Sequence, residues 1–239
     1  MNNRQRRRQD DSHPMAYAVH GLTALGAALG FLALEAVIGG DFRAAFGWLG
    51  IALVVDAIDG PIARLIRIED TAPRYDGRVL DLVVDYLTYV IVPAAILLQP
   101  EVMPHPHGLI AGTVIAAASA LYFADTGMKT EDGWFKGFPA VWNVVMFYIV
   151  LFRPGATIAL GGLVLLTVLM FLPAKFIHPF RVRPWRLLNV SLLILWFMAS
   201  GWAVWQKFQP DVITRSVILT VGAYFLLLGL LRRSDPAED

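Results

Sequence analysis

DAIDGPIARLIRIEDTAPRYDGRVLDLVVD, residues 56–85, is the stretch that decides the fold, because it carries four aspartates in or beside two apolar runs. These aspartates are Asp56, Asp59, Asp81 and Asp85. A carboxylate within a membrane-spanning helix costs a few kcal/mol on insertion scales. Four of them in one short stretch therefore need a physical reason, and the spacing of the residues indicates one.

Helical spacing places the first part of this stretch on one face. The residues that share the face follow the spacing i, i+3, i+4, i+7 and i+8, and are Asp56, Asp59, Gly60, Ala63 and Arg64. The second part has a spacing of four, in Gly77, Asp81 and Asp85. A short connection between two helices makes them antiparallel neighbours. We therefore expect the two acidic faces to meet at a similar membrane depth, near one water interface.

Clustered carboxylate oxygens favour hard divalent cations such as Mg²⁺ or Mn²⁺. Two such ions together form a clamp that suits a pyrophosphate group. The small residues Gly60, Ala63 and Gly77 leave room for a bulky ligand near the backbone, and Arg64 offers a planar charged fork to phosphate. Ion pairing with nearby arginines would explain one of the acids, but it does not explain four on two faces that also carry small residues.

The resulting pattern is Asp56-x2-Asp59-Gly60-x2-Ala63-Arg64-x12-Gly77-x3-Asp81-x3-Asp85. It resembles the signature of the CDP-alcohol phosphatidyltransferases, and the similarity extends from about residue 15 to about residue 233. Most members have eight residues between the arginine and the next glycine, whereas this chain has twelve. That longer spacer resembles the bacterial phosphatidylcholine synthase branch. The resemblance implies transfer of a phosphatidyl group from CDP-diacylglycerol to an alcohol, choline in that branch, with release of CMP.

The same resemblance implies roles for individual residues. The expected ligands of a two-metal site with Mn²⁺ or Mg²⁺ are Asp56, Asp59, Asp81 and Asp85. Asp85 is also the expected catalytic base, which takes the proton of the acceptor hydroxyl. The residues expected to hold the CDP phosphates are Asp59, Gly60, Ala63, Arg64 and Gly77. Among partners, the resemblance implies a homodimer, the substrates CDP-diacylglycerol and choline, and membrane lipids; no nucleic-acid partner is expected.

Two further groups of residues are candidates for binding the other ends of the substrates. A basic and aromatic segment could hold the lipid donor's phosphate through Lys175, Arg181 and Arg183, although anchoring at lipid headgroups explains it equally well. Aromatic faces bind quaternary ammonium groups, and the candidates for choline are Tyr86, Tyr89, Tyr122, Trp134 and Trp142. Aromatic residues of membrane helices more often belong to the core or the interfacial belt.

The composition is that of a membrane protein. Of the 239 residues, 57% are hydrophobic and 16% are charged, whereas soluble domains are roughly 45–50% apolar. The absence of cysteine excludes a disulfide framework and a thiolate ligand or nucleophile. Apolar segments near the spanning length of ~20 residues occupy 16–38, 45–67, 79–98, 108–126, 138–153, 156–174, 187–206 and 212–231. We predict an all-α polytopic membrane protein with about eight transmembrane helices.

Lysine and arginine indicate the orientation of these helices. With the N-terminus inside, only Arg43, Arg153, Lys207 and Arg215 of the 20 basic residues fall on the outer side. We expect a basic cytosolic tail at 1–14, a single membrane-embedded domain at 15–233 and a cytosolic C-terminal tail at 234–239. The site would then open to the cytosol from a bacterial inner membrane, where nucleotide-linked substrates and Mg²⁺ are available.

Several alternatives remain open at this point. The acceptor could be serine, inositol or glycerol phosphate, and a related reaction would use CDP-choline and diacylglycerol. A cation transporter could use the same acids as an ion path, although the helices are apolar beyond Asp56 and Asp85.

In the first segment, the spacing of Gly21, Gly26 and Gly30 favours close helix packing. His20 could contact the nucleotide or donate to a neighbouring carbonyl.

Overall fold

The computed structural model describes residues 14–66, 74–127, 135–173, 175–176 and 185–231. Five of the described helices are long and apolar enough to cross a membrane, and three shorter apolar helices accompany them. The prediction of an all-α polytopic fold is confirmed. The candidate residues Trp134, Arg181 and Arg183, and nearly all of both tails, lie outside the described residues. The chain divides into two compact units, Met1–Val92 and Pro93–Asp239.

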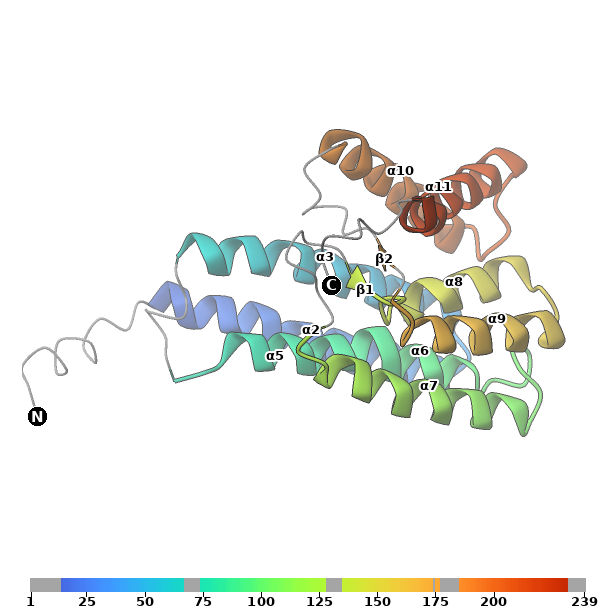
Figure 1. Ribbon diagram of the computed structural model, residues 1–239, viewed down its shortest axis with the longest axis horizontal. Helices are drawn as coiled ribbons and strands as arrows, with labels where there is room; N and C mark the ends of the chain where they lie inside the picture. The colour runs from blue at the N-terminus through green and yellow to red at the C-terminus, as the bar shows by residue number, and fades with distance from the viewer. Residues whose placement is uncertain (1–13, 67–73, 128–134, 174, 177–184, 232–239) are drawn as a thin grey trace, which may run out of the picture. The chain divides into compact units, whose positions relative to one another are not determined.

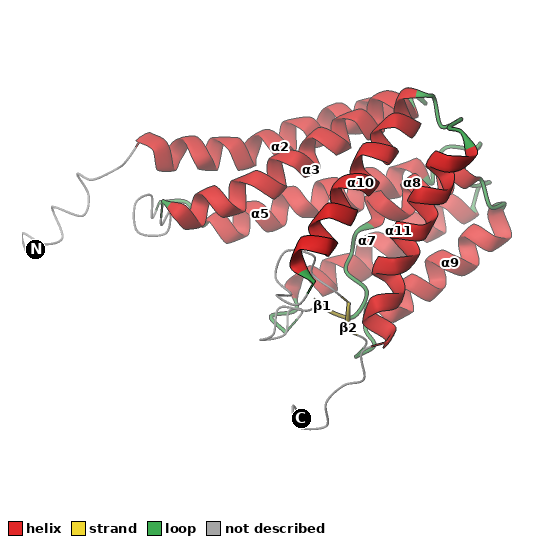
Figure 2. Ribbon diagram, turned by 90° about the horizontal axis from the view of Figure 1, so that it is seen from above, coloured by secondary structure: helices red, strands yellow, loops and turns green. Residues whose placement is uncertain are grey.

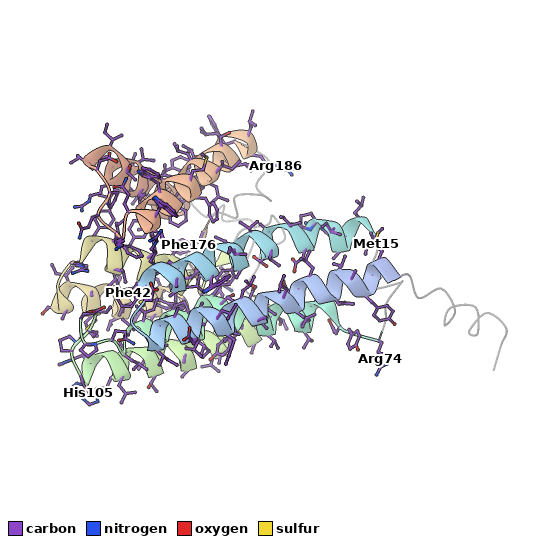
Figure 3. All side chains as sticks on the ribbon, turned by 180° about the vertical axis from the view of Figure 1, so that it is seen from behind. Met15, Phe42, Arg74, His105, Phe176 and Arg186 are labelled. Atoms are coloured by element: carbon purple, nitrogen blue, oxygen red, sulfur yellow. The ribbon has the colours of Figure 1, made fainter. Side chains whose placement is uncertain are left out.

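The first unit is built from three neighbouring helices. They are α2 (Pro14–Ile38), α3 (Phe42–Leu65) and α5 (Gly77–Asp85), which continues into a π-helical turn, η1 (Tyr86–Ile91). Helix α2 packs against α3 and against α5 and η1, so the three helices lie side by side (Figures 1 and 2). Met15 and Arg74 lie at one end of these helices and Phe42 at the other (Figure 3).

Capping residues set the ends of these helices. Gly40 has a φ of +72°, which only glycine adopts at no steric cost, and it ends the turn after α2. Asp41 then caps α3 by accepting a hydrogen bond from the Ala44 amide at 3.0 Å. Asp76 caps α5 in the same way, accepting from the Arg78 amide at 2.9 Å. The first residues of the second acidic face are therefore fixed by a local cap.

Two glycines of α2 allow it to pack closely against α5 and η1. A Cβ atom at Gly26 would lie 2.6 Å from Cγ1 of Val84, and one at Gly30 would lie 2.9 Å from Cδ2 of Leu87. The predicted packing role is confirmed at these two positions. It is wrong for Gly21, where a Cβ atom would meet nothing within 4 Å. Gly26 therefore allows α2 to approach α5 closely, and Gly30 allows it to approach η1.

The second unit begins within α6 (Val92–Ile96). Its further elements are α7 (His107–Ala124), β1 (Phe135–Lys136), α8 (Trp142–Phe152), α9 (Ala156–Leu169), β2 (Lys175–Phe176), α10 (Arg186–Trp205) and α11 (Val212–Leu231). The predicted break at 153–155 is confirmed, because α8 ends there with Arg153 in the left-handed region at φ +46°. Helix α10 packs against α11, and α7 packs against α9. The antiparallel pair β1–β2 was not expected from the sequence.

Hydrogen bonds between aromatic side chains and other helices hold the second unit. The Tyr148 hydroxyl donates to the Ile218 carbonyl at 2.7 Å. The Tyr224 hydroxyl donates to Oδ1 of the buried Asn189 at 2.8 Å and so links α11 to α10. The Trp142 indole donates to Oγ of Ser119 at 2.9 Å. The side chains of Trp142, Ser119 and Asn189 are buried, and each forms one of these hydrogen bonds, in line with the rule that buried polar groups need partners.

Candidate metal centre

Three of the four aspartates converge in the first unit. One carboxylate oxygen from each of Asp56, Asp81 and Asp85 lies within 4.8 Å of the others. Asp56 is nine residues before Leu65, the end of α3, and Asp85 is eight residues after Gly77, the start of α5. At a rise of about 1.5 Å per residue, these positions are about 14 Å and about 12 Å from helix ends that lie at the same end of the unit. Antiparallel packing therefore brings the two acidic faces to one depth.

The donor set fits a hard divalent ion. All three groups are carboxylates, and ligands of Mg²⁺ lie at about 2.0–2.1 Å, so two oxygens on one ion are at most about 4.2 Å apart. The oxygens of the triad lie within 4.8 Å of one another. This separation exceeds the limit for one ion only slightly, and a small rotation of a side chain would remove the difference. The three side chains are half-buried, which leaves them accessible to a ligand. An acidic triad able to bind a metal ion is thus present.

Asp59 is not part of this group. Its side chain is only 4% exposed, and it lies on α3 one turn after Asp56. The sequence pattern gave no reason to separate it from the other three aspartates, because a spacing of three also keeps residues on one face. Its assignment as a metal ligand and as a CDP-binding residue stays a prediction.

A π-helical turn directly follows Asp85, and one of its tyrosines contacts the acidic triad. The amide of Val92 donates to the carbonyl of Leu87, five residues back, as in a π-helix. Within this turn, the Tyr89 hydroxyl donates to Oδ2 of Asp56 at 2.7 Å. The bond connects the third span to α3 at the acidic triad. Sequence reasoning identified Tyr89 only as a candidate for choline, because helical periodicity does not reveal a π-turn.

The small residues of the motif have different surroundings. A Cβ atom at Gly60 would lie 3.4 Å from Nη1 of Arg64, so the exposed Arg64 side chain folds back along this bare stretch of α3. Ala63 packs against the buried pair Ala16 and Val19 on α2. Their assignment to CDP binding stays a prediction, and Ala63 has in addition a packing role that the spacing did not reveal.

An aromatic cluster lies at the start of α5, beside the motif glycine. The His20 ring is 5.7 Å from the ring of Tyr75, which is 6.1 Å from the ring of Tyr17. A Cβ atom at Gly77 would lie 3.3 Å from Cε1 of His20. The His20 side chain is 6% exposed, and among the described residues its Nε2 has no hydrogen-bond partner. Gly77 thus allows α2 and α5 to approach, and Tyr75 is a neighbour that the sequence did not indicate.

The remaining candidates lie in both units and stay predictions. Tyr86 is half-buried in η1, next to Asp85. Tyr122 on α7 is 5% exposed and Trp142 on α8 is 0% exposed. Lys175 lies in β2, where the strand register places it opposite Lys136.

Comparison with known proteins gives consistent relatives. No protein-family model matches the chain. The chain is 41% identical over 222 residues to a phosphatidylcholine synthase of Brucella melitensis, a match that covers 93% of this chain and 80% of that protein. It is 39% identical over 222 residues to a phosphatidylcholine synthase of Rhizobium johnstonii, covering 93% and 92%. A protein of the same name from Pseudomonas aeruginosa is 38% identical over 217 residues, covering 91% of each chain.

Proposed function

This chain belongs to the phosphatidylcholine synthase family, and from that premise we propose that it transfers the phosphatidyl group of CDP-diacylglycerol to choline and releases CMP. The observation that carries the proposal is the convergence of Asp56, Asp81 and Asp85 between two membrane-spanning helices. Carboxylates within a membrane are costly, and a catalytic centre in an enzyme that makes phosphatidylcholine would explain why this chain has them. The reaction class follows from the family, and the acidic triad supplies its chemical centre.

The bond changes of this reaction are simple. The choline hydroxyl oxygen forms a new bond to the phosphorus that carries diacylglycerol, and the pyrophosphate bond to CMP breaks. Asp85 takes the hydroxyl proton, since a carboxylate at this position can accept it as attack proceeds. The negative charge that develops on CMP needs stabilisation, and electrostatic stabilisation of this kind is usually the largest contribution to catalysis.

The proposed ligands of the metal ions are Asp56, Asp59, Asp81 and Asp85, of which three form the observed group. When bound, Mn²⁺ or Mg²⁺ supplies Lewis-acid neutralisation of the pyrophosphate charge. The residues proposed to bind the CDP phosphates are Asp59, Gly60, Ala63, Arg64 and Gly77. Arg64 contributes a permanent positive charge, and the glycines give the phosphates access to the backbone.

We also propose the cellular setting that the basic residues favour. The chain is a multi-pass membrane protein with five helices of spanning length among its described residues. The site opens to the cytosol of a bacterial inner membrane, and residues 15–233 act as one membrane-embedded domain. The enzyme works as a homodimer. The candidates for choline remain the aromatic residues Tyr86, Tyr89, Tyr122, Trp134 and Trp142, and those for the lipid phosphate remain the basic residues Lys175, Arg181 and Arg183.

The alternatives receive less support. The names of the relatives favour choline over serine, inositol or glycerol phosphate. A cation path would need polar groups toward the outer face, but residues 44–55 and 86–98 contain no charged side chain. The acidic triad therefore sits at one depth rather than along a continuous path.

An acceptor screen tests the proposal. The purified protein is given CDP-diacylglycerol, Mn²⁺ or Mg²⁺, and one labelled acceptor at a time, with EDTA as a control. We expect labelled phosphatidylcholine and CMP with choline, and no product after chelation. Label that enters lipid only from serine, inositol or glycerol phosphate would reject the acceptor. Product from CDP-choline and diacylglycerol alone would reject the donor.

A further inference from the structure

The hydrogen bond from Tyr89 to Asp56 connects η1, the turn that follows Asp85, to α3, the helix that carries Asp56. Its length of 2.7 Å is that of a well-formed O–H···O bond, and a bond of this kind to an ionised carboxylate is about twice as strong as one between neutral groups. The bond engages one carboxylate oxygen, Oδ2, while a carboxylate has about four lone-pair sites in total. Asp56 therefore retains the capacity to bind a cation while the tyrosine hydroxyl restrains its rotation.

The π-turn explains how Tyr89 reaches this position. In an α-helix, residues four apart advance by about 40° around the axis, because each residue turns about 100°. Asp81, Asp85 and Tyr89 are each four apart, so a regular α-helix would rotate Tyr89 about 80° away from Asp81. A π-turn holds more residues in each turn, which reverses this drift over residues 86–91. The turn thus returns Tyr89 to the acidic face.

We propose that Tyr89 is a positioning residue of the metal centre, whose hydroxyl holds the Asp56 carboxylate in the orientation that binds the divalent ion. This inference rests on the proposed function, since the shared cation is what gives the three carboxylates a common ligand. Partners that orient a ligating group commonly change metal affinity or activity by about 10–100-fold when they are removed. This role differs from the predicted role of the Tyr89 ring as an aromatic receptor for choline.

The two roles of Tyr89 depend on different atoms, so they can be separated. A positioning role needs the hydroxyl, whereas a cation–π role needs only the ring face. Tyr89→Phe removes the hydroxyl and keeps the ring. Tyr89→Leu removes both. Tyr224→Phe is a matched control, because Tyr224 also donates a helix-to-helix hydrogen bond to a side-chain oxygen, at 2.8 Å, but outside the site.

The experiment measures Mn²⁺ binding directly, without substrates. Free Mn²⁺ is quantified by electron paramagnetic resonance during titration of metal-free protein in detergent, and the melting temperature of the metal-free protein is recorded for each variant. We expect Tyr89→Phe to raise the Mn²⁺ dissociation constant about tenfold or more and to leave the choline KM at saturating Mn²⁺ unchanged. Tyr224→Phe should keep the wild-type dissociation constant.

The outcomes separate this inference from the proposed function. An unchanged Mn²⁺ dissociation constant in Tyr89→Phe overturns the positioning role, even if the metal-free protein melts at a lower temperature. A choline KM that rises only in Tyr89→Leu, with unchanged Mn²⁺ affinity in both variants, assigns the ring to choline and also overturns it. Wild-type protein that binds no Mn²⁺ overturns it as well. Wild-type protein that binds Mn²⁺ but forms no phosphatidylcholine rejects the proposed function, and the Tyr89→Phe affinity still decides the positioning role.

Discussion

Replacement of Gly26 by alanine should disable the site without a change to any residue of the acidic triad. The new Cβ atom would lie 2.6 Å from Cγ1 of Val84, whereas carbon atoms in contact prefer about 3.5–4.0 Å. Val84 is buried and, as a β-branched residue in a helix, has one strongly favoured rotamer. The collision is therefore relieved by moving α5 away from α2 by about 1 Å. Asp85 is the next residue after Val84 and moves with it.

The size of the effect follows from this displacement. A misplacement of about 1 Å can cost about 100-fold in rate, which corresponds to about 2.7 kcal/mol in activation free energy. Alanine has a higher helix propensity than glycine by about 1 kcal/mol, so the variant should still fold. We expect Gly26→Ala to lower kcat/KM for choline about 100-fold, measured as labelled phosphatidylcholine formed by purified protein.

Two further variants make the Gly26 prediction specific. Gly21→Ala changes the same residue type on the same helix, but its Cβ atom would have no neighbour within 4 Å, so activity should be retained. Val84→Ala removes the colliding methyl group, so in the Gly26→Ala background it should restore part of the lost activity, as a double-mutant cycle would show. Full activity of Gly26→Ala, or equal losses in Gly21→Ala and Gly26→Ala, would refute the reasoning.

Other predictions concern the proposed base and the topology. Asp85→Asn should abolish phosphatidylcholine formation while the purified protein keeps its helical circular dichroism; a variant with wild-type turnover would remove the assigned role. The chain contains no cysteine, so single cysteines at Glu101 and Gly127 can be labelled without background. A membrane-impermeant maleimide should label the first in intact cells and the second only after lysis, and the opposite pattern would invert the proposed orientation.

The sequence predicted the parts of this structure that depend on periodicity and composition. Apolar segments of spanning length predicted the helices, and the break at 153–155 separated α8 from α9 because Pro154 and Gly155 in succession strongly disfavour a continuous helix. The i, i+4 spacing of Asp81 and Asp85 gave the acidic face that meets Asp56. These features follow from local rules that hold whatever the rest of the chain does.

Features that depend on contacts between distant segments were not predictable in the same way. The π-turn at 86–91 changes the helix register without a sequence signal, so the bond from Tyr89 to Asp56 was not expected. The separation of Asp59 from the triad depends on how α3 faces its neighbours rather than on spacing. Likewise, the collision expected for a side chain at Gly26, and its absence at Gly21, appear only when α5 packs against α2.

Structural constraints around the acidic centre explain how the fold tolerates the electrostatic cost of clustered carboxylates. Three half-buried carboxylates within 4.8 Å of one another repel each other when they are ionised, because like charges at this distance interact unfavourably. The constraints around them are nevertheless rigid: a capped start of α5, a glycine-lined contact with α2 and a tyrosine bond to Asp56. Such constraints keep the three carboxylates close together, so a divalent cation bound there would reduce the repulsion between them. Loosening any one of the three constraints should therefore weaken Mn²⁺ binding more than it weakens folding.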